Sequence, residues 1–252
     1  MSKQEALFNY LLRLGDSSLV LSHRLSEWCG HGPLLEEDIA LTNIALDLIG
    51  RANSLLEYAA KVEGKGRTED EIAYMRSERN FFNNLLSEQP NGDYGQTIAR
   101  QYFIDAFEIH LYIALSKSKD ETLAGIAAKS LKEIQYHLRH SSSWMLRLGD
   151  GTEESNRRLQ SAVNELYRFT GSLFETDEND SVLIAEGIVP DLKTIQEQWQ
   201  KDVDTMLGKS MLKKAENVWM QKGSLQGRHT EHLGFILAEM QSLHRAYPEA
   251  KW

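Results

Sequence analysis

Cysteine, proline and long apolar runs are scarce in this sequence. It contains one cysteine, Cys29, so no disulfide can form within the chain, and this fits a reducing compartment such as the cytoplasm. Only four prolines occur, which leaves room for long helices. No apolar run approaches the ~18 residues of a membrane span, and the N-terminal residues lack the apolar core of a signal peptide. We therefore expect a cytoplasmic protein without a membrane partner.

Basic residues are outnumbered by acidic ones. The sequence has 28 Lys and Arg against 37 Asp and Glu, which gives a formal net charge of -9. This balance opposes a nucleic-acid partner, because phosphate binding requires clustered cationic side chains. Hydrophobic residues make up 41% of the chain and no linker divides it, so we expect one large domain over residues 1–252.

Apolar residues at helical spacing are present along almost the whole chain. Turn residues separate these stretches, and no segment shows a convincing strand pattern. The sequence therefore predicts an all-α helical bundle with additional shorter helices. The expected helices are residues 4–28 with a break at 15–16, then 35–63, 69–86, 97–117, 120–148, 152–173, 192–207 and 230–246.

Several features have ordinary interpretations. The acidic segment 175–180 is typical of a solvated connection between helices. Cys29 has no neighbouring pattern for nucleophilic catalysis, so we expect a small packed side chain. No phosphate-binding loop or dinucleotide fingerprint is present.

The middle of the 120–148 helix bears on metal chemistry. Carboxylate-bridged di-iron bundles place Glu-x-x-His on such a helix, because residues three apart lie on one face and can bind a metal together. Here the frame is Ile134-Gln-Tyr-His137, and isoleucine cannot ligate a metal. None of the eight histidines has an aspartate or glutamate three residues before it. The motif is therefore absent from the chain.

Two His-x-x-His pairs remain, His137 with His140 and His229 with His232. Each pair could place two imidazoles on one face, but a mononuclear site needs a third ligand that the sequence does not identify. The other interpretation is that these are hydrogen-bonded structural histidines, and we expect this one.

Five separate blocks, in the right order, resemble one family. Residues 21–33, 38–50, 88–92, 97–103 and 229–234 are similar to the C subunits of bacterial phenylacetyl-CoA epoxidases, the ring 1,2-phenylacetyl-CoA monooxygenases. Two of these blocks read Leu-Ser-His-Arg-Leu-Ser-Glu-Trp-Cys-Gly-His-Gly-Pro and Asp-Ile-Ala-Leu-Thr-Asn-Ile-Ala-Leu-Asp-Leu-Ile-Gly. The resemblance covers nearly the whole chain.

The resemblance implies a ferritin-like helical bundle that pairs with a homologous catalytic A subunit, and that partner holds the di-iron centre. The assembled complex, which includes a reductase subunit, would use dioxygen and electrons from NADPH to epoxidise the ring of phenylacetyl-CoA during aerobic phenylacetate breakdown. In this chain itself we expect no cofactor and no metal.

The resemblance also places ligand positions on this sequence. Glu27 falls on the first-helix carboxylate and Asp105 on the third-helix carboxylate, while the paired motifs become Ile-Ala-Leu-Asp at 44–47 and Ile-Gln-Tyr-His at 134–137. Both bridging glutamates are thereby isoleucine. The vestigial positions are Glu27, Ile44, Asp47, Asp105, Ile134 and His137.

Carboxylates left in a core without a cation would be strongly destabilising. We therefore expect the three vestigial ones to be paired, hydrogen-bonded, protonated or turned outward, with His137, Tyr136 and Arg51 as candidate partners.

In this family the substrate lies in the catalytic subunit near its contact with the C subunit. By resemblance, contacts with the CoA ester are expected at Asn80, Phe81, Phe82 and Asn83 and at Ser181, Val182 and Leu183. The alternative at both segments is ordinary helix packing and a solvated loop.

The leading hypothesis is a non-catalytic structural subunit that stabilises its catalytic partner. One alternative is an independently active ferritin-like di-metal oxygenase, with ligands drawn from Glu27, Asp47, Asp105, Glu108, Glu133 and His137. Another is a helical binding module with no link to an oxygenase. The sequence leaves open whether the chain also forms a homodimer and whether it touches phenylacetyl-CoA directly.

Overall fold

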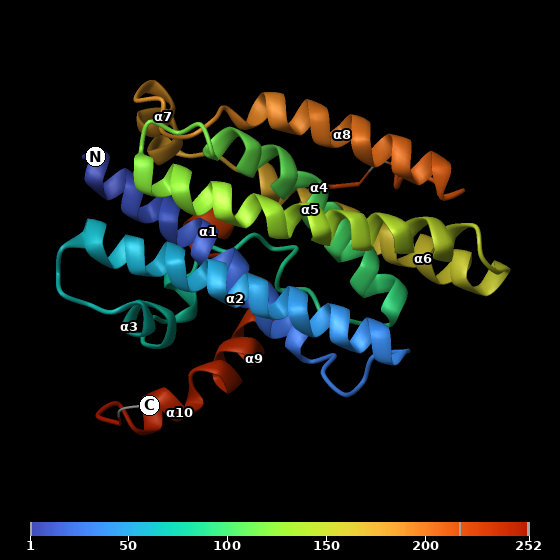
Figure 1. The fold of residues 1–252 in the computed structure, drawn as a ribbon, viewed down its shortest axis with the longest axis horizontal. Helices are drawn as coiled ribbons and strands as arrows, with labels where there is room; N and C mark the ends of the chain where they lie inside the picture. Colours follow the sequence, from blue (N-terminus) through green and yellow to red (C-terminus); the bar gives the residue numbers. More distant parts are fainter. Residues whose placement is uncertain (1, 217, 251–252) are drawn as a thin grey trace. The chain divides into compact units, whose positions relative to one another are not determined.

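The computed structural model describes residues 2–216 and 218–250. Within these residues every regular element is a helix, which confirms the all-α fold class (Figure 1). The described residues divide into two compact units. Unit 1 comprises residues 2–89, 177–183 and 223–250, and unit 2 comprises 90–176, 184–216 and 218–222. The domain expected over residues 1–252 includes positions 1, 217, 251 and 252, which lie outside the described residues.

Unit 1 is built on the antiparallel pair α1 (Lys3–Ser26) and α2 (Leu35–Glu63), which lie side by side in Figure 1. Helix α1 begins where the Ser2 hydroxyl accepts a hydrogen bond from the Glu5 amide. Helix α2 ends at Gly64, whose φ of 69° is the left-handed conformation that closes many helices. Local sequence chemistry therefore sets both of these ends.

The break expected at residues 15–16 does not occur, because α1 runs through it. A Cβ added to Gly15 would lie 2.7 Å from Leu56 Cδ2, so the absence of a side chain lets α1 and α2 approach closely. Glycine at this position serves helix packing and does not end the helix. Cys29, expected to be packed, is exposed in the turn after α1.

The prediction of a helix over residues 69–86 is wrong beyond residue 74. Only α3 (Glu69–Tyr74) and the short 3₁₀ helix η1 (Glu78–Asn80) form, and residues 81–89 have no regular helix. Side chains from elsewhere in unit 1 bind this backbone: Asp16 Oδ2 accepts from the Phe82 amide at 2.9 Å, and Ser17 Oγ accepts from the Asn84 amide at 3.1 Å. These contacts replace the helical hydrogen bonds.

The last expected helix, residues 230–246, is interrupted. Helix α9 (Glu231–Met240) and helix α10 (Ser242–Ala246) are separated at Gln241. The Gln241 amide is buried and donates to the carbonyls of Ala73 at 3.2 Å and Arg76 at 3.0 Å. The segment that precedes α9 contains the short 3₁₀ helix η3 (Ser224–Gln226).

Unit 2 contains a second antiparallel pair of long helices, α4 (Tyr94–Leu115) and α5 (Glu121–Gly149). Helix α6 (Glu153–Leu166), the 3₁₀ segment η2 (Tyr167–Phe174) and helix α8 (Leu192–Lys209) pack against this pair. Each unit is thus organised around two long helices, the element from which ferritin-like bundles are made.

An aromatic cluster forms the core of unit 2. The ring of Trp199 lies 6.1 Å from that of Phe103 and 5.2 Å from that of Phe174, centroid to centroid. The Trp199 indole Nε1 donates to the Phe103 carbonyl at 2.9 Å, so its polar atom is satisfied in the interior. The ring of Tyr167 also belongs to this cluster and lies 5.9 Å from that of Phe103.

Helix α7 (Glu178–Ala185) begins inside the segment expected to be an acidic loop. Its residues up to 183 belong to unit 1. Across the described residues, no helix combines the length and the apolar character that a membrane span requires.

We predict that Gly149→Ala destabilises the protein by about 1–3 kcal/mol, the usual cost of overpacking. A Cβ at this position would lie 2.2 Å from the backbone carbonyl oxygen of Ser210, where α5 meets the chain after α8. The free energy of unfolding in urea measures the effect.

Gly125→Ala on the same helix is the matched control. Nothing lies within 4 Å of the added Cβ, so the variant should gain up to about 1 kcal/mol from helix propensity. Equal changes in both variants would contradict the packing explanation.

Candidate functional site

Three positions that the resemblance assigns to metal ligands belong to unit 1, one directly after α1 and two on α2. Glu27 directly follows α1, and its side chain is 45% exposed and accepts a hydrogen bond from Arg24 at 2.8 Å. Ile44 is buried in the core, and Asp47 is half-buried less than one turn later. Arg51, a suggested partner of Asp47, is buried and donates from Nε to Ser18 Oγ at 3.0 Å. The side chain of Glu27 therefore points toward solvent and forms an ion pair with Arg24.

The other three positions that the resemblance assigns to metal ligands lie in unit 2, on α4 and α5. Asp105 is buried and its Oδ2 accepts a hydrogen bond from Ser141 Oγ at 2.7 Å. His137 is buried on α5, one turn before Ser141, and Ile134 is fully buried one turn earlier still. The hydroxyl thus supplies one of the hydrogen bonds that a buried carboxylate needs.

This donor set does not fit a di-iron centre. Such a centre takes bridging carboxylates from paired Glu-x-x-His motifs, and the side chains at the positions that the family resemblance assigns to them, Ile44 and Ile134, are hydrocarbon. Among the residues that the structure describes, no group of three or more His, Cys, Asp and Glu side chains could hold a metal ion. We therefore derive no reaction step through iron in this chain.

A pocket in unit 1 is lined by one of the residues expected near the substrate, Phe82, and by none of Ser181, Val182 and Leu183. It has a volume of about 140 Å³ and is open to solvent on one side. Its lining comes from α1, from the loop after η1, from the start of α7 and from η3: Asn9, Arg13, Phe82, Asp177, Asn179 and Leu225. Amide and charged side chains thus line the pocket together with the apolar side chains of Phe82 and Leu225.

One wall of this pocket is held by Arg13. Its guanidinium makes a bidentate ion pair with Asp180, with Nη–Oδ distances of 2.9 and 3.1 Å, and lies 3.5 Å from Asp177. Asn179 accepts from Asn9 Nδ2 at 3.1 Å. Asp180 is 2% exposed, so the acidic segment expected to be solvated is instead folded onto α1.

The residues expected near the substrate divide by exposure. Phe81, Asn83 and Leu183 are fully buried, while Phe82 and Val182 are half-buried. The exposed members are Asn80 and Ser181. Only the half-buried and exposed members, Asn80, Phe82, Ser181 and Val182, offer side-chain atoms to a ligand.

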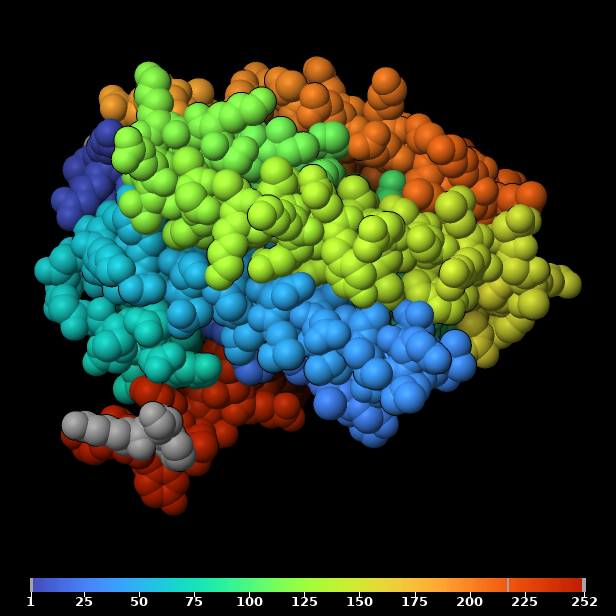
Figure 2. Space-filling view, in the orientation of Figure 1, coloured from blue at the N-terminus to red at the C-terminus, as the bar shows by residue number. Residues whose placement is uncertain are grey.

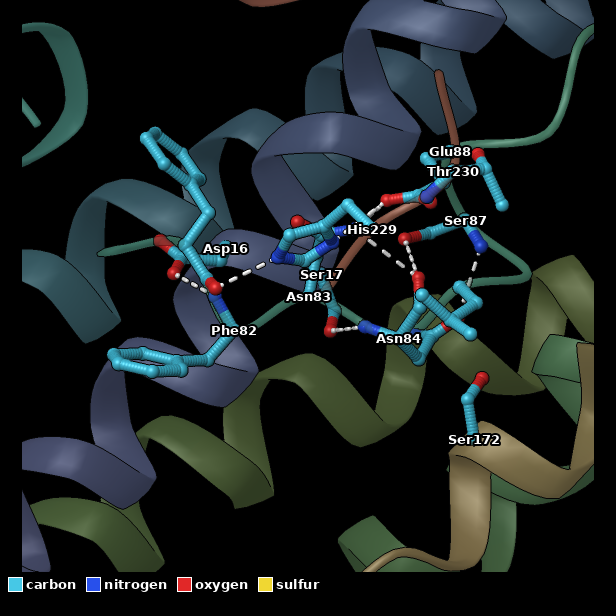
Figure 3. Close-up of polar contacts among 12 residues, drawn as sticks. Asp16, Ser17, Phe82, Asn83, Asn84, Ser87, Glu88, Ser172, His229 and Thr230 are labelled. Atoms are coloured by element: carbon cyan, nitrogen blue, oxygen red, sulfur yellow. Dashed lines mark hydrogen bonds and ion pairs between the residues drawn. The ribbon is translucent and has the colours of Figure 1, made fainter. Parts of the chain in front are cut away.

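A buried carboxylate, Glu88, fixes the loop that contains Phe82. Its Oε2 accepts from Asn83 Nδ2 at 2.9 Å and faces His229 Nδ1 at 2.9 Å, and its Oε1 accepts from the Thr230 amide at 2.6 Å. The second ring nitrogen of His229, Nε2, faces the Phe81 carbonyl at 2.8 Å. Figure 3 shows the imidazole lying between these two acceptors.

Both ring nitrogens of His229 face oxygen atoms, an arrangement that favours the imidazolium form, in which both nitrogens donate. Burial alone would lower the pKa of His229, but the hydrogen bonds to Glu88 and to the Phe81 carbonyl outweigh it and raise the pKa above 6.5. The structural interpretation of this histidine is confirmed.

Several residues of the site carried no local sequence signal. The partners of Arg13 lie more than 160 residues away, and Glu88 occupies what looked like a simple turn. One signal could have pointed to Glu88. A buried histidine that binds no metal needs an acidic or carbonyl hydrogen-bond partner, so His229 predicts such a group elsewhere in the chain.

We predict that His229→Gln lowers the free energy of unfolding by about 3 kcal/mol at pH 6, because a buried charged pair loses its cation. The pKa of His229 is raised in the folded state, so this stability is fully present below pH 6.5 and is lost as the pH rises through the raised pKa. Urea unfolding between pH 6 and 9 should show the two proteins converging.

His110→Gln is the control. His110 Nε2 lies 2.7 Å from the exposed carboxylate of Asp202, and a solvent-exposed pair of this kind contributes at most about 1 kcal/mol. If both variants lose equal stability at every pH, the assignment of a buried imidazolium is wrong.

Two comparisons with known proteins bear on this site. The family model described as "Phenylacetic acid catabolic protein" matches residues 1–252. The C subunit of the 1,2-phenylacetyl-CoA epoxidase of Escherichia coli (strain K12) is 50% identical over 243 residues, which cover 96% of this chain and 98% of the relative. The resemblance noted from the sequence blocks is thereby confirmed, and the chain belongs to the phenylacetic acid catabolic protein family.

Proposed function

We propose that this chain is a non-catalytic structural subunit of a cytoplasmic multicomponent 1,2-phenylacetyl-CoA epoxidase that acts in aerobic phenylacetate catabolism. The observation that carries the proposal is the 50% identity, over 96% of the chain, to the C subunit of that enzyme from Escherichia coli. In this assignment the chain pairs with a homologous di-iron A subunit and stabilises it. A reductase subunit delivers electrons from NADPH.

The character of the vestigial positions supports a non-catalytic role. Buried isoleucines at 44 and 134 give the helices apolar packing where a metal site would need bridging oxygens. Glu27 is turned outward to Arg24, and Asp105 is held by Ser141. The chain thus keeps the long helices without a metal to compensate the remaining carboxylates.

An independently active di-metal oxygenase has weaker support. It would need an unconventional ligand set drawn from Glu27, Asp47, Asp105, Glu108, Glu133 and His137, and one of these candidates, Glu27, has a side chain that is 45% exposed and paired with Arg24. It would also need bridging oxygens from residues other than Ile44 and Ile134. These two requirements leave the structural role better supported.

The first test is metal analysis of the chain purified alone from iron-supplemented cells. We expect less than about 0.1 iron per chain after mild chelation, because two aliphatic side chains cannot supply the bridges. The complex purified with its A subunit should retain iron. Stoichiometric, chelation-resistant iron in the isolated chain would establish the alternative function.

We further propose that the pocket beside Phe82 contacts the pantetheine arm of the CoA ester. The amides of Asn9 and Asn179 and the ring of Phe82 line it, which suits a ligand of alternating amides and methylenes. Its volume of about 140 Å³ accommodates only a part of that arm. Asn80, Ser181 and Val182 are the neighbouring residues with accessible side chains on the segments expected from the family resemblance.

For this contact we predict that Phe82→Ala raises KM for phenylacetyl-CoA in the assembled enzyme about fivefold and leaves kcat nearly unchanged. That combination reports a binding contact away from the reacting atoms. The control is Phe235→Ala, which removes an exposed ring outside the pocket and should leave KM unaltered. An unchanged KM in Phe82→Ala would remove the pocket from the substrate path.

A further inference from the structure

One peptide group of unit 1 is held at both of its polar ends. It joins Phe81 to Phe82, and its carbonyl oxygen lies 2.8 Å from His229 Nε2. Its amide donates to Asp16 Oδ2 at 2.9 Å. The side chain of Phe81 is buried in the core, and that of Phe82 lines the pocket of unit 1. Because a peptide group is planar and turns as one body, its orientation decides whether Phe82 forms the pocket wall.

The hold on the carbonyl end depends on a proton. His229 Nδ1 lies 2.9 Å from Glu88 Oε2, so both contacts of the ring are hydrogen bonds only when both nitrogens carry hydrogen. A neutral imidazole has one such hydrogen, and a carboxylate holds it more strongly than a neutral carbonyl does. The other nitrogen would then present a lone pair to the Phe81 oxygen. Deprotonation therefore breaks the contact with Phe81 and keeps the one with Glu88.

The segment that carries His229 is anchored by other hydrogen bonds. The Thr230 amide donates to Glu88 Oε1 at 2.6 Å, and Gln241 donates to two carbonyls beside α3. Figure 2 shows the end of the chain, in red, lying against the teal segment around α3. These hydrogen bonds do not involve the imidazole. The part that moves when the proton leaves is therefore the peptide group before Phe82.

The acids around His229 favour the proton. Burial lowers the pKa of His229, but the hydrogen bonds to Glu88 and to the Phe81 carbonyl, together with the charge of Glu78 on η1, raise it above 6.5. The side chains of His229 and Glu88 are both fully buried, so solvent screens their interaction little. The hold on the peptide group is therefore present at acidic pH and is lost as the pH rises.

The other charged groups of this region contact different atoms. Arg24 of α1 donates to the backbone carbonyl of Glu88 at 3.1 and 2.9 Å. At the amide end of the peptide group, Asp16 forms an ion pair with Arg76. The first turn of α9 contributes two further titratable residues, the exposed Glu231 and the half-buried His232.

We propose that His229 is a positioning residue that acts through its proton: the imidazolium holds the peptide group between Phe81 and Phe82, and its deprotonation releases Phe82 from the pocket wall. The release itself concerns unit 1 alone. Its effect on a substrate rests on the proposed function, in which this pocket contacts the CoA ester. The ester would then bind more tightly at acidic than at alkaline pH.

The test is an NMR titration of the full chain between pH 5.5 and 9.5, with ¹³C-labelled histidine and ¹⁵N-labelled phenylalanine. We expect the His229 imidazole to titrate with a midpoint above pH 6.5, and the Phe82 amide to shift with the same midpoint. The amide of Phe103, in the core of unit 2, should not follow it. His229→Gln identifies the imidazole signal and should abolish the shift of the Phe82 amide.

Three acid-to-amide variants test the control of the proton. Glu88→Gln removes the carboxylate beside the imidazole and should lower both midpoints together by at least about one pH unit. Glu78→Gln changes an exposed side chain, which keeps the fold, and should lower both midpoints by less. Asp202→Asn is the matched control, because it removes an exposed carboxylate beside a different histidine and should leave both midpoints unchanged.

The effect on the substrate is tested in the assembled enzyme. As the pH rises through the midpoint, KM for phenylacetyl-CoA should rise up to about fivefold, the change expected for Phe82→Ala, with kcat nearly unchanged. In the enzyme that contains His229→Gln, KM should no longer change at this midpoint, because the glutamine carries no titrating proton.

The outcomes separate the inference from the proposed function. The inference is wrong if the imidazole does not titrate between pH 6.5 and 9.5, or if the Phe82 amide does not move with it. It is also wrong if neither Glu88→Gln nor Glu78→Gln lowers the midpoint. If both signals titrate together but KM stays constant, the release is established and the substrate contact of the proposed function is wrong.

Discussion

A carboxylate in a protein interior is stable only when hydrogen-bond donors or a cation surround it, and much of unit 1 depends on meeting that condition. Glu88 is surrounded by His229, Asn83 and the Thr230 amide. Asp16, also buried, accepts hydrogen bonds from the Arg76 guanidinium and from the Phe82 amide. These two acids join the loop after η1 to α1 and to the chain before α9. They thereby fix the backbone of the loop that carries Phe82 into the pocket wall.

Under the proposed function, the same condition accounts for a ferritin-like fold without a metal site. Ile44 and Ile134, which the family resemblance assigns to ligand positions, are buried and contribute apolar packing that needs no compensating charge. Where carboxylates stayed, they found partners, Arg24 for Glu27 and Ser141 for Asp105. Under the proposed function, the loss of iron ligands would leave the helix pairs intact, because fold and catalytic competence can separate within one family.

Interactions over long sequence separations decided where the helix predictions succeeded and failed. The long helices α2, α4 and α5 were predictable, because their apolar spacing and capping residues are local properties of the sequence. The irregular stretch after Tyr74 was not predictable. Its backbone amides donate hydrogen bonds to the side chains of Asp16 and Ser17, which lie more than 60 residues earlier in the sequence. Likewise, the buried Gln241 interrupts the last helix by donating to carbonyls beside α3. No local pattern contains that information.

The sequence by itself determined the all-α class, the absence of any Glu-x-x-His motif and the family, because these depend on residue identity and spacing alone. Only the tertiary structure decided that the acidic segment before α7 is folded onto Arg13 and that His229 is the partner of Glu88. It also decided which apolar residues of α2 are buried and which are exposed. When a helix is apolar on more than one face, its own sequence does not determine which face is buried, because the elements that pack against the helix decide this.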